Sequence, residues 1–176
     1  MRNLPLLVTV TLIALGGGNL VAQEPDPYLV GGGQFGRWKL GMPEEELVKV
    51  FRDLFGSRYR TEATVSIGGG RFFFWDNAGF NITAFQGKVA AISIWRRRNA
   101  ADTELLKYHT SEEIRIGEPL QRAIAAYSTP DRQWISRATS GNTVLMWLRF
   151  GLFLEVRGNL IDVVGIFDPR LPWIWP

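Results

Sequence analysis

The same order of predicted elements, a helix start followed by four strands, occurs twice in this sequence. This duplication limits the possible folds more than any other feature. Leu40-Gly41-Met42-Pro43 matches Ile116-Gly117-Glu118-Pro119, and each tetrapeptide precedes apolar residues at the i, i+3, i+4 and i+7 spacing of one buried helix face. Proline suits the first position of a helix, because the N–H that it lacks would have no helical partner there. The pattern predicts two helices, which begin near Pro43 and Pro119.

Each predicted helix is followed by predicted strands in the same order. They cover 58–67, 71–75, 80–84 and 89–95 in the first half, and 132–139, 143–147, 152–156 and 160–167 in the second. Gly87 and Gly158 stand at matching hairpin turns, and Trp75 matches Trp147. The predicted fold class is α+β: two tandem α-β(4) repeats, with the helices packed on one face of an antiparallel sheet.

The predicted domain organisation follows from this duplication. From the N-terminus the predicted segments are a signal peptide (1–22), a flexible lead-in (23–36), repeat 1 (37–95), a connector (96–112), repeat 2 (113–167) and a Pro- and Trp-rich tail (168–176). The sequence leaves open whether the two repeats form one sheet or two lobes.

The first segment has the form of a secretory signal peptide, with Arg2, an apolar run over 4–15 and Ala22 as the cleavage-site residue. The run is shorter than the roughly 20 residues that span a bilayer, so no stable membrane span is expected after signal cleavage. The chain has no Cys, and a disulfide-free exported protein fits a bacterial envelope better than a eukaryotic secretory route. The expected location is therefore periplasmic or secreted, of bacterial type.

The composition excludes several chemistries. With no Cys and a single His, the chain cannot carry out thiol catalysis or hold disulfides, thiolate zinc, iron–sulfur clusters or multi-His metal sites. His109 lies in the polar connector without a nucleophile elbow, so a surface histidine is expected rather than a catalytic one. Residues 31–36 match the dinucleotide fingerprint by letter, but no helix follows the glycines directly, so a flexible tether is expected. We predict no catalytic residue, no metal and no cofactor.

The phrases Arg37-Trp38-Lys39-Leu40-Gly41-Met42-Pro43 and Glu113-Ile114-Arg115-Ile116-Gly117-Glu118-Pro119-Leu120, each followed by a helix and a meander, resemble a known family. They are similar to the tandem-repeat β-lactamase-inhibitor-like fold, and to the single unit in the small lipoproteins of outer-membrane barrel assembly. The resemblance covers roughly residues 35–167. It implies helices on one face of an antiparallel sheet and an open concave face that grips other proteins. The inhibitor's disulfides and a lipid-anchoring Cys are absent, and no contact residue is carried over.

Alternation along the strands sorts the side chains onto two faces. The face expected beneath the helices is apolar and comprises Phe72, Phe74, Phe80, Ile82, Ile92, Ile94, Val144, Met146, Leu152, Leu154 and Val163. The opposite face mixes aromatic with charged side chains, as the centres of protein interfaces do. The candidate partner-binding residues on it are Phe73, Trp75, Phe85, Trp95, Trp147, Arg149, Phe153, Glu155 and Arg157.

These features predict a non-catalytic exported binding module whose partner is another envelope or secreted protein. No nucleic-acid partner is expected, because the net charge is only +3 and the chain carries an export signal. One alternative is a small envelope carbohydrate-binding protein or hydrolase that uses the tryptophans as sugar platforms and Glu155 for chemistry. Others are a structural part of a larger assembly, or a face covered by the chain's own lead-in or tail. The sequence does not fix the partner or the oligomeric state.

Overall fold

The structure is a computed structural model of the chain and describes residues 26–56, 62–65, 70–75, 79–95, 107–136 and 141–171. Within these ranges residues 54, 55, 62–65, 74 and 75 are described by their backbone alone. The predicted signal peptide, most of the connector, the end of the tail and the side chains of Phe74 and Trp75 lie outside the described part.

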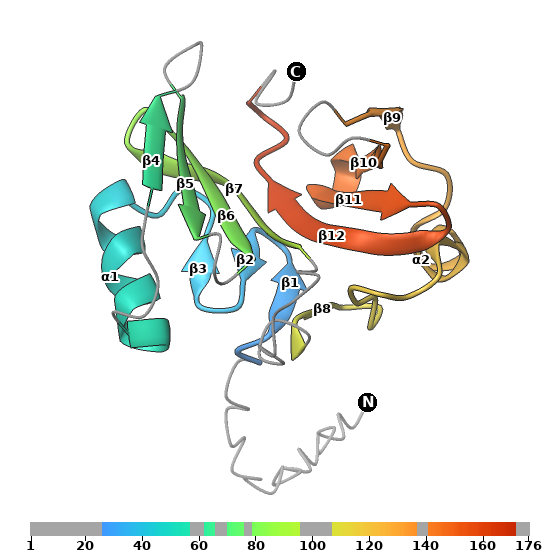
Figure 1. Cartoon of the computed structure of the whole chain (residues 1–176), viewed down its shortest axis with the longest axis horizontal. Coiled ribbons are helices and arrows are strands. Elements are labelled where there is room, and N and C mark those ends of the chain that lie inside the picture. The colour runs from blue at the N-terminus through green and yellow to red at the C-terminus, as the bar shows by residue number, and fades with distance from the viewer. Residues whose placement is uncertain are drawn as a thin grey trace, which may run out of the picture.

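A large antiparallel sheet forms the frame of the molecule (Figure 1), with the strand order β4-β5-β6-β7-β12-β11-β10-β9. Its strands are β4 (Glu62–Val65), β5 (Gly70–Trp75), β6 (Phe80–Phe85), β7 (Lys88–Trp95), β9 (Arg132–Ile135), β10 (Thr143–Trp147), β11 (Leu152–Arg157) and β12 (Leu160–Phe167). A short 3-10 turn, η4 (Leu148–Phe150), follows β10. The central strands β7 and β12 pair from Ala91 opposite Phe167 to Trp95 opposite Val163. The strands of both halves therefore share one continuous sheet.

Two hairpins set the register of the longest strands. Gln86 and Gly87 have φ values of 51° and 73°, the pattern of a type I′ turn, whose twist matches that of the strands it joins. Gly158, with φ of 63°, lies in the turn between β11 and β12. Both predicted hairpin turns are confirmed.

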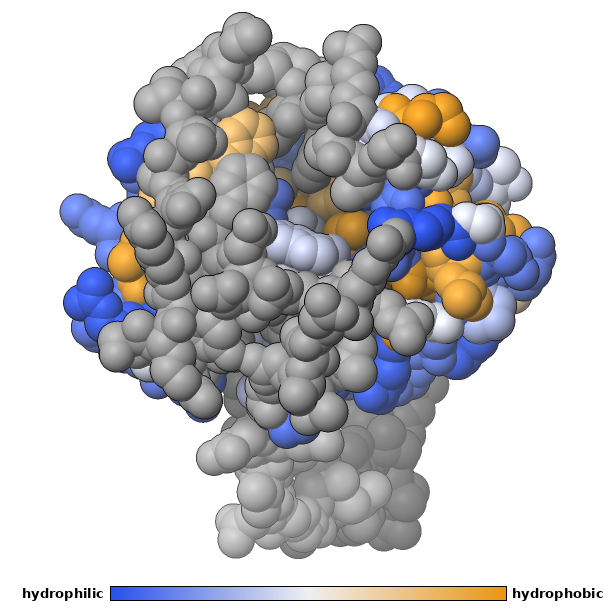
Figure 2. All heavy atoms as spheres, viewed as in Figure 1, coloured by the Kyte–Doolittle hydropathy of each residue, from blue (hydrophilic) through white to orange (hydrophobic). Residues whose placement is uncertain are grey.

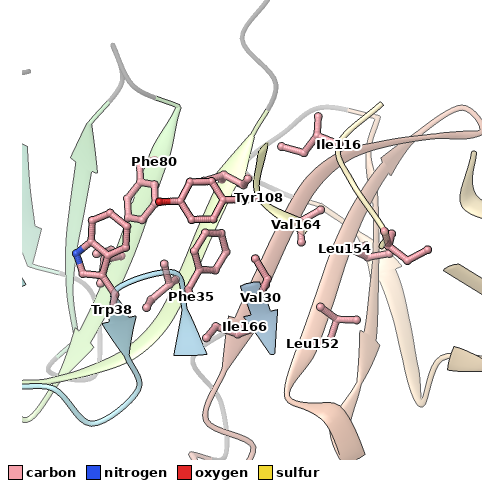
Figure 3. Packing of buried hydrophobic residues seen from close by; sticks show 14 of the residues in the cluster. Val30, Phe35, Trp38, Phe80, Tyr108, Ile116, Leu152, Leu154, Val164 and Ile166 are labelled. Atoms are coloured by element: carbon pink, nitrogen blue, oxygen red, sulfur yellow. The ribbon is translucent and has the colours of Figure 1, made fainter. Parts of the chain in front are cut away.

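A small sheet packs against the middle of the large one. Its order is β3 (Trp38–Lys39), β2 (Gln34–Phe35), β1 (Leu29–Gly31) and β8 (His109–Thr110), and β1 runs parallel to β8. In Figure 1 this sheet lies between the two helices. Figure 3 shows Val30, Phe35 and Trp38 pointing into the core, where the Trp38 ring lies 4.6 Å from that of Phe80 between centroids.

Residues 26–36 thus form strands and turns that are anchored in the core by Val30 and Phe35, and the prediction of a flexible lead-in is wrong for them. Phe35 and Trp38 are completely buried, and each gains the free energy of removing a large apolar surface from water. Gly36 allows this packing, because a Cβ there would lie 2.5 Å from the Pro27 carbonyl oxygen and 2.7 Å from the Tyr108 ring.

The described residues contain two α-helices, α1 (Glu44–Phe55) and α2 (Leu120–Tyr127), each directly after the predicted proline. Their starts are held by matching backbone bonds: the Gly41 N–H donates to the Val89 oxygen at 2.7 Å, and the Gly117 N–H to the Ile161 oxygen at 2.8 Å. The α1 helix opens with three glutamates, which its positive N-terminal dipole stabilises. Both predicted helix starts are confirmed.

The predicted fold class, two tandem α-β(4) repeats with the helices packed on one face of an antiparallel sheet, is nevertheless wrong. The described molecule is mostly β, with two sheets and only two α-helices. The small sheet, built from the lead-in, the start of predicted repeat 1 and the connector, occupies the middle of the face that the prediction assigned to helices. Buried Val30, Phe35 and Tyr108 close that part of the core instead.

Each face of the large sheet has its own core. The helix-side face holds Phe80, Ile82, Ile92, Ile94, Leu152 and Leu154, as predicted, together with Phe73, Leu145, Trp147, Val164 and Ile166. The opposite face, called the far face below, holds Ala91, Val144, Met146, Phe153, Val163 and Phe167. The predicted helix-side positions of Val144, Met146 and Val163 are wrong, and so is that of Phe72, since its neighbour Phe73 faces the core.

Candidate functional site

One row of side chains crosses the far face of the large sheet and ends in an indole at each side. The cross-strand pairs place Trp95, Val163, Glu155, Val144 and Trp134 opposite one another in that order, on β7, β12, β11, β10 and β9. With neighbouring strands about 4.8 Å apart, the row is about 19 Å long measured along the sheet. Both indoles are half-buried, and both pack against the apolar cluster of this face.

A hydrogen-bonded polar group lies next to the centre of this row. Asn142 is completely buried, and its amide lies 3.4 Å from a Glu155 oxygen and 3.3 Å from an Asp162 oxygen. The Arg157 guanidinium donates to the Asn142 oxygen at 3.1 Å and pairs with Asp162 at 2.8 Å. Because the buried amide is satisfied on both sides, this network fixes the side chains beside the row.

The next row on the far face shows how tightly it is packed. Phe153 of β11 lies opposite Gly165 of β12, which in turn lies opposite Ser93 of β7. The Phe153 ring occupies the space that a side chain at 165 would need. The far face is therefore a rigid platform, and its partly exposed positions lie at the ends of the Trp95–Trp134 row and around Arg157.

The structure separates the predicted binding residues into three groups. Phe73 and Trp147 belong to the helix-side core, so their predicted exposure is wrong. Phe153 and Glu155 lie on the far face but are buried there, so their contacts are mainly internal. The remaining described side chains are at least partly exposed, and they are Phe85, Trp95, Arg149 and Arg157.

Trp147 illustrates the first group. It is only 2% exposed, its ring lies 5.9 Å from that of Tyr127 on α2, and its indole N–H donates to the Ser128 carbonyl at 3.1 Å. That carbonyl follows the last residue of α2, where helices leave their carbonyl groups without intrahelical partners. Trp147 therefore helps to hold the end of α2 on the sheet.

Trp134 is the residue that the sequence prediction missed. It lies within a predicted strand, but its indole is assigned to neither face there. The pairing of β9 with β10 places Trp134 opposite Val144. An aromatic residue on an alternating edge strand was the available signal, and only the register shows that it shares a row with Trp95.

His109 lies in β8 of the small sheet, where its side chain connects this strand to the lead-in. Its side chain is 13% exposed, with Nε2 3.1 Å from Asp26 Oδ2 and Nδ1 3.0 Å from the Thr110 carbonyl oxygen. Glu113 Oε1 lies 3.4 Å from the same Nδ1. All three partners are acceptor oxygens, so each ring nitrogen of His109 faces at least one acceptor.

We expect Asp26→Asn and His109→Gln to be non-additive, because both remove the same link between the lead-in and β8. A double-mutant cycle in chemical denaturation is expected to give a coupling free energy of about 1 kcal/mol. Additivity within about 0.3 kcal/mol would show that the contact does not hold the lead-in in place.

A fall in pH should reduce the stability that Glu113 contributes to the turn beside His109. The hydrogen bond from Arg115, at 2.6 Å, lowers the pKa of Glu113, and the nearby charge of His109 acts in the same direction. A carboxyl group with a lowered pKa in the folded state stabilises the fold above its unfolded pKa, and this contribution is lost as the pH falls through the folded value. The Glu113→Gln variant should therefore show a shallower loss of stability in the acid range than the wild type.

The described residues contain no group of three or more His, Asp or Glu side chains placed to hold a metal ion. Nor does any helix among them have the length and apolar character needed to cross a membrane.

Comparison with known proteins gives limited similarity. No family model matches the chain, and none of the curated proteins matches it. Among solved structures, it is similar to a cysteine-rich secretory protein from Staphylococcus aureus subsp. aureus Mu50, with a TM-score of 0.44 and 11% identity over 83% of this chain and 50% of that one. It is also similar to an extracellular protein containing a SCP domain from Bacillus anthracis str. Ames, with a TM-score of 0.41 and 12% identity over 75% of this chain and 45% of that one. The chain thus spans about half the length of these proteins.

These findings contradict the family expected from the sequence. The structural neighbours are a cysteine-rich secretory protein and a SCP-domain protein, not β-lactamase-inhibitor-like proteins. The short phrases that carried the resemblance describe how a proline starts a helix beside a glycine hairpin, and such local geometry is not specific to one family.

Proposed function

We propose that this chain is an exported, non-catalytic binding module that holds another envelope or secreted protein against the far face of its large sheet. The observation that carries the proposal is the row from Trp95 to Trp134, with two half-buried indoles at the ends of a rigid platform. Tryptophan and arginine dominate the energetics of protein interfaces, because they bury much surface and keep a polar group available.

The surroundings of the row favour a protein partner. Between the two indoles, Val144 and Val163 flank the buried Glu155, and exposed Arg132 and Arg157 lie nearby. Aromatic, apolar and arginine side chains are enriched in protein-binding patches. Figure 2 shows apolar patches over the C-terminal half of the molecule among hydrophilic residues, which is the mixture expected of a module that is soluble when unbound.

Export of the chain is part of the proposal and is supported by the sequence of residues 1–22. The neighbours described above as secretory and extracellular proteins are weakly similar in structure, and export is not inferred from them.

Carbohydrate binding is the second candidate, because indoles beside a carboxylate and an amide also suit sugars. A hydrolase needs two carboxyl groups that exchange protons with substrate. Here Glu155 and Asp162 contact the same Asn142 amide, and Asp162 is also paired with Arg157. Carboxylates held in this way are better suited to shaping a surface than to proton transfer, so binding is favoured over hydrolysis.

The test is a double variant, Trp95→Ala with Trp134→Ala, used with the wild type to capture partners from the native envelope fraction after chemical cross-linking. Ile135→Ala is the matched control, because Ile135 is exposed on the same strand as Trp134 but projects from its other side. We expect a protein captured by the wild type and the control, and a loss of at least about tenfold in its affinity for the double variant when it is purified.

Circular dichroism should show that the double variant remains folded, since both indoles are partly exposed. Identical partner sets from the folded double variant and the wild type would rule out this face. Binding to peptidoglycan or another polysaccharide that depends on both tryptophans would replace the protein partner with the second candidate.

A further inference from the structure

A second surface feature lies on the helix side of the molecule, away from the Trp95–Trp134 row. It is a cleft of about 520 Å³ between the β3–α1 connection and the exposed side of α1. The lining residues are Arg37, Lys39, Leu40, Gly41, Met42, Glu46, Val50 and Asp53. The cleft therefore has apolar side chains, two cations from the β2–β3 region and two carboxylates from α1.

Three of the four charges in this cleft have no ion-pair partner among the described residues. Arg37, Lys39 and Glu46 form no ion pair with a described residue. Asp53 lies 3.9 Å from Lys49, but both side chains are well exposed, and such a pair contributes little. Opposite charges thus stand on opposite sides of the cleft without neutralising each other.

The start of α2 shows what the same backbone arrangement looks like when its charges are satisfied. There the Glu118 carboxylate accepts from the Arg115 backbone N–H at 3.1 Å and pairs with Arg122, and Arg115 pairs with Glu113 at 2.6 Å. Every charge at that helix start has a partner, and Glu118 links the strand side to the helix side.

At the start of α1 this linking carboxylate is missing. Met42 precedes Pro43 as Glu118 precedes Pro119, and Glu46 stands where Arg122 does. The Leu40 N–H donates to the Gly33 oxygen, so the preceding Lys39 N–H points away from β2 by strand alternation. Lys39 stands at the position that matches Arg115, whose backbone N–H donates to the Glu118 carboxylate. It therefore offers a backbone donor and a cation at the start of α1.

We propose that this cleft binds a segment of a partner protein in which an acidic, an apolar and a basic residue follow one another. The acidic side chain takes the position of the Glu118 carboxylate and bonds to Lys39 and Arg37. The apolar side chain packs on Met42 and Val50, and the basic one reaches Glu46. Successive side chains of an extended segment point to opposite faces, so the bound segment adopts a turn that directs all three side chains into the cleft.

The probe is the peptide acetyl-Glu-Leu-Lys-amide, titrated into the full mature chain and followed by amide NMR shifts. The expected result is millimolar binding that shifts the signals of Lys39, Met42 and Val50. The neutral peptide acetyl-Gln-Leu-Gln-amide should bind at least tenfold more weakly, because it keeps the apolar contact and loses both charges.

Variants of the cleft test the role of each side. Lys39→Gln and Glu46→Gln should each weaken the charged peptide at least threefold and leave the neutral peptide unchanged. Met42→Glu should abolish binding, because it supplies in the chain itself the carboxylate that the peptide otherwise provides. Arg115→Gln is the matched control at the start of α2 and should leave peptide binding unchanged.

Equal binding of the charged and neutral peptides, no measurable binding, or shifts that map elsewhere on the molecule would overturn the proposal. So would full binding by a folded Met42→Glu variant. All of these residues lie on the opposite side of the large sheet from Trp95 and Trp134, so the outcome is independent of the far-face test.

Discussion

Replacing Trp147 by alanine is expected to destabilise the fold by about 4 kcal/mol, as large truncations of buried aromatic residues do. The indole is almost completely buried between the large sheet and α2, so its truncation leaves a cavity in the core. The substitution also removes the hydrogen bond to the Ser128 carbonyl at the end of α2. Urea denaturation followed by circular dichroism measures the effect.

Trp147→Phe and Trp134→Ala are the controls for this prediction. Phenylalanine keeps most of the buried ring and loses the indole N–H, so it should cost about 1–2 kcal/mol. Trp134 is half-buried at the edge of the sheet, so its truncation should cost less than that of Trp147. A Trp147→Ala variant that unfolds at the same urea concentration as the wild type would contradict its assignment to the core.

The burial of Trp147 determines which tryptophan variants can test binding. Trp75 and Trp147 match in the sequence, and the pair is an obvious choice for a surface mutant. Loss of a partner in a Trp147 variant would report unfolding rather than a lost contact. The half-buried tryptophans of the far face, Trp95 and Trp134, are the pair whose removal separates binding from stability.

The sequence predicts the helices and hairpins of this chain well, because their signals are local. A proline with an amphipathic stretch after it places the starts of α1 and α2, and one glycine marks each long hairpin. The strand 160–167 is also predicted with the boundaries observed. None of these features depends on contacts with distant parts of the chain.

The structure of the lead-in is not predicted from the sequence, because it depends on tertiary contacts with distant residues. The strands β1 and β2 have three and two residues, too few for alternation to show, and the glycines beside them are typical of flexible linkers. Those glycines instead take positive φ values in tight turns. What holds the segment is the burial of Val30 and Phe35 against residues much later in the sequence.

The two faces of the large sheet are predicted correctly in some strands and not in others. In β6 and β11 the inward residues are as predicted, because Phe80, Ile82, Leu152 and Leu154 keep a clear alternation. In β10 the four residues 144–147 are all apolar and buried, so alternation gives no contrast between faces. Trp147 belongs to this run, and Phe73 stands in a similar run, since residues 72–75 are all aromatic. The prediction therefore places both residues on the wrong face.

A glycine within the strand β12 carries information about the packing of the far face. A single glycine within a strand often marks the close approach of another group, and Gly165 stands within β12. Phe153, a predicted contact residue, packs over that glycine from the neighbouring strand and is only 1% exposed. The pair explains why an aromatic residue of the far face has a structural role.

Gly165→Ala is therefore expected to destabilise the fold by about 3 kcal/mol, at the upper end of typical overpacking effects. A Cβ at this position would overlap the Phe153 ring and lie 2.8 Å from the Ile92 carbonyl oxygen, which belongs to a central strand and cannot move away. Gly165 has no positive φ, so the cost is steric and not a matter of backbone conformation. Thermal denaturation should show a melting temperature lower by about 10 °C.

Two further variants test whether the overlap with the Phe153 ring causes the loss of stability in Gly165→Ala. Gly158→Ala places a Cβ in open space at a residue with φ of 63°, so it should cost only the roughly 1 kcal/mol of a left-handed backbone. Phe153→Leu in the Gly165→Ala background should recover part of the lost stability, because the smaller side chain frees the space above the strand. If the two changes were simply additive, the ring of Phe153 would not be what excludes a side chain at 165, and the far face would be less tightly packed than its geometry indicates.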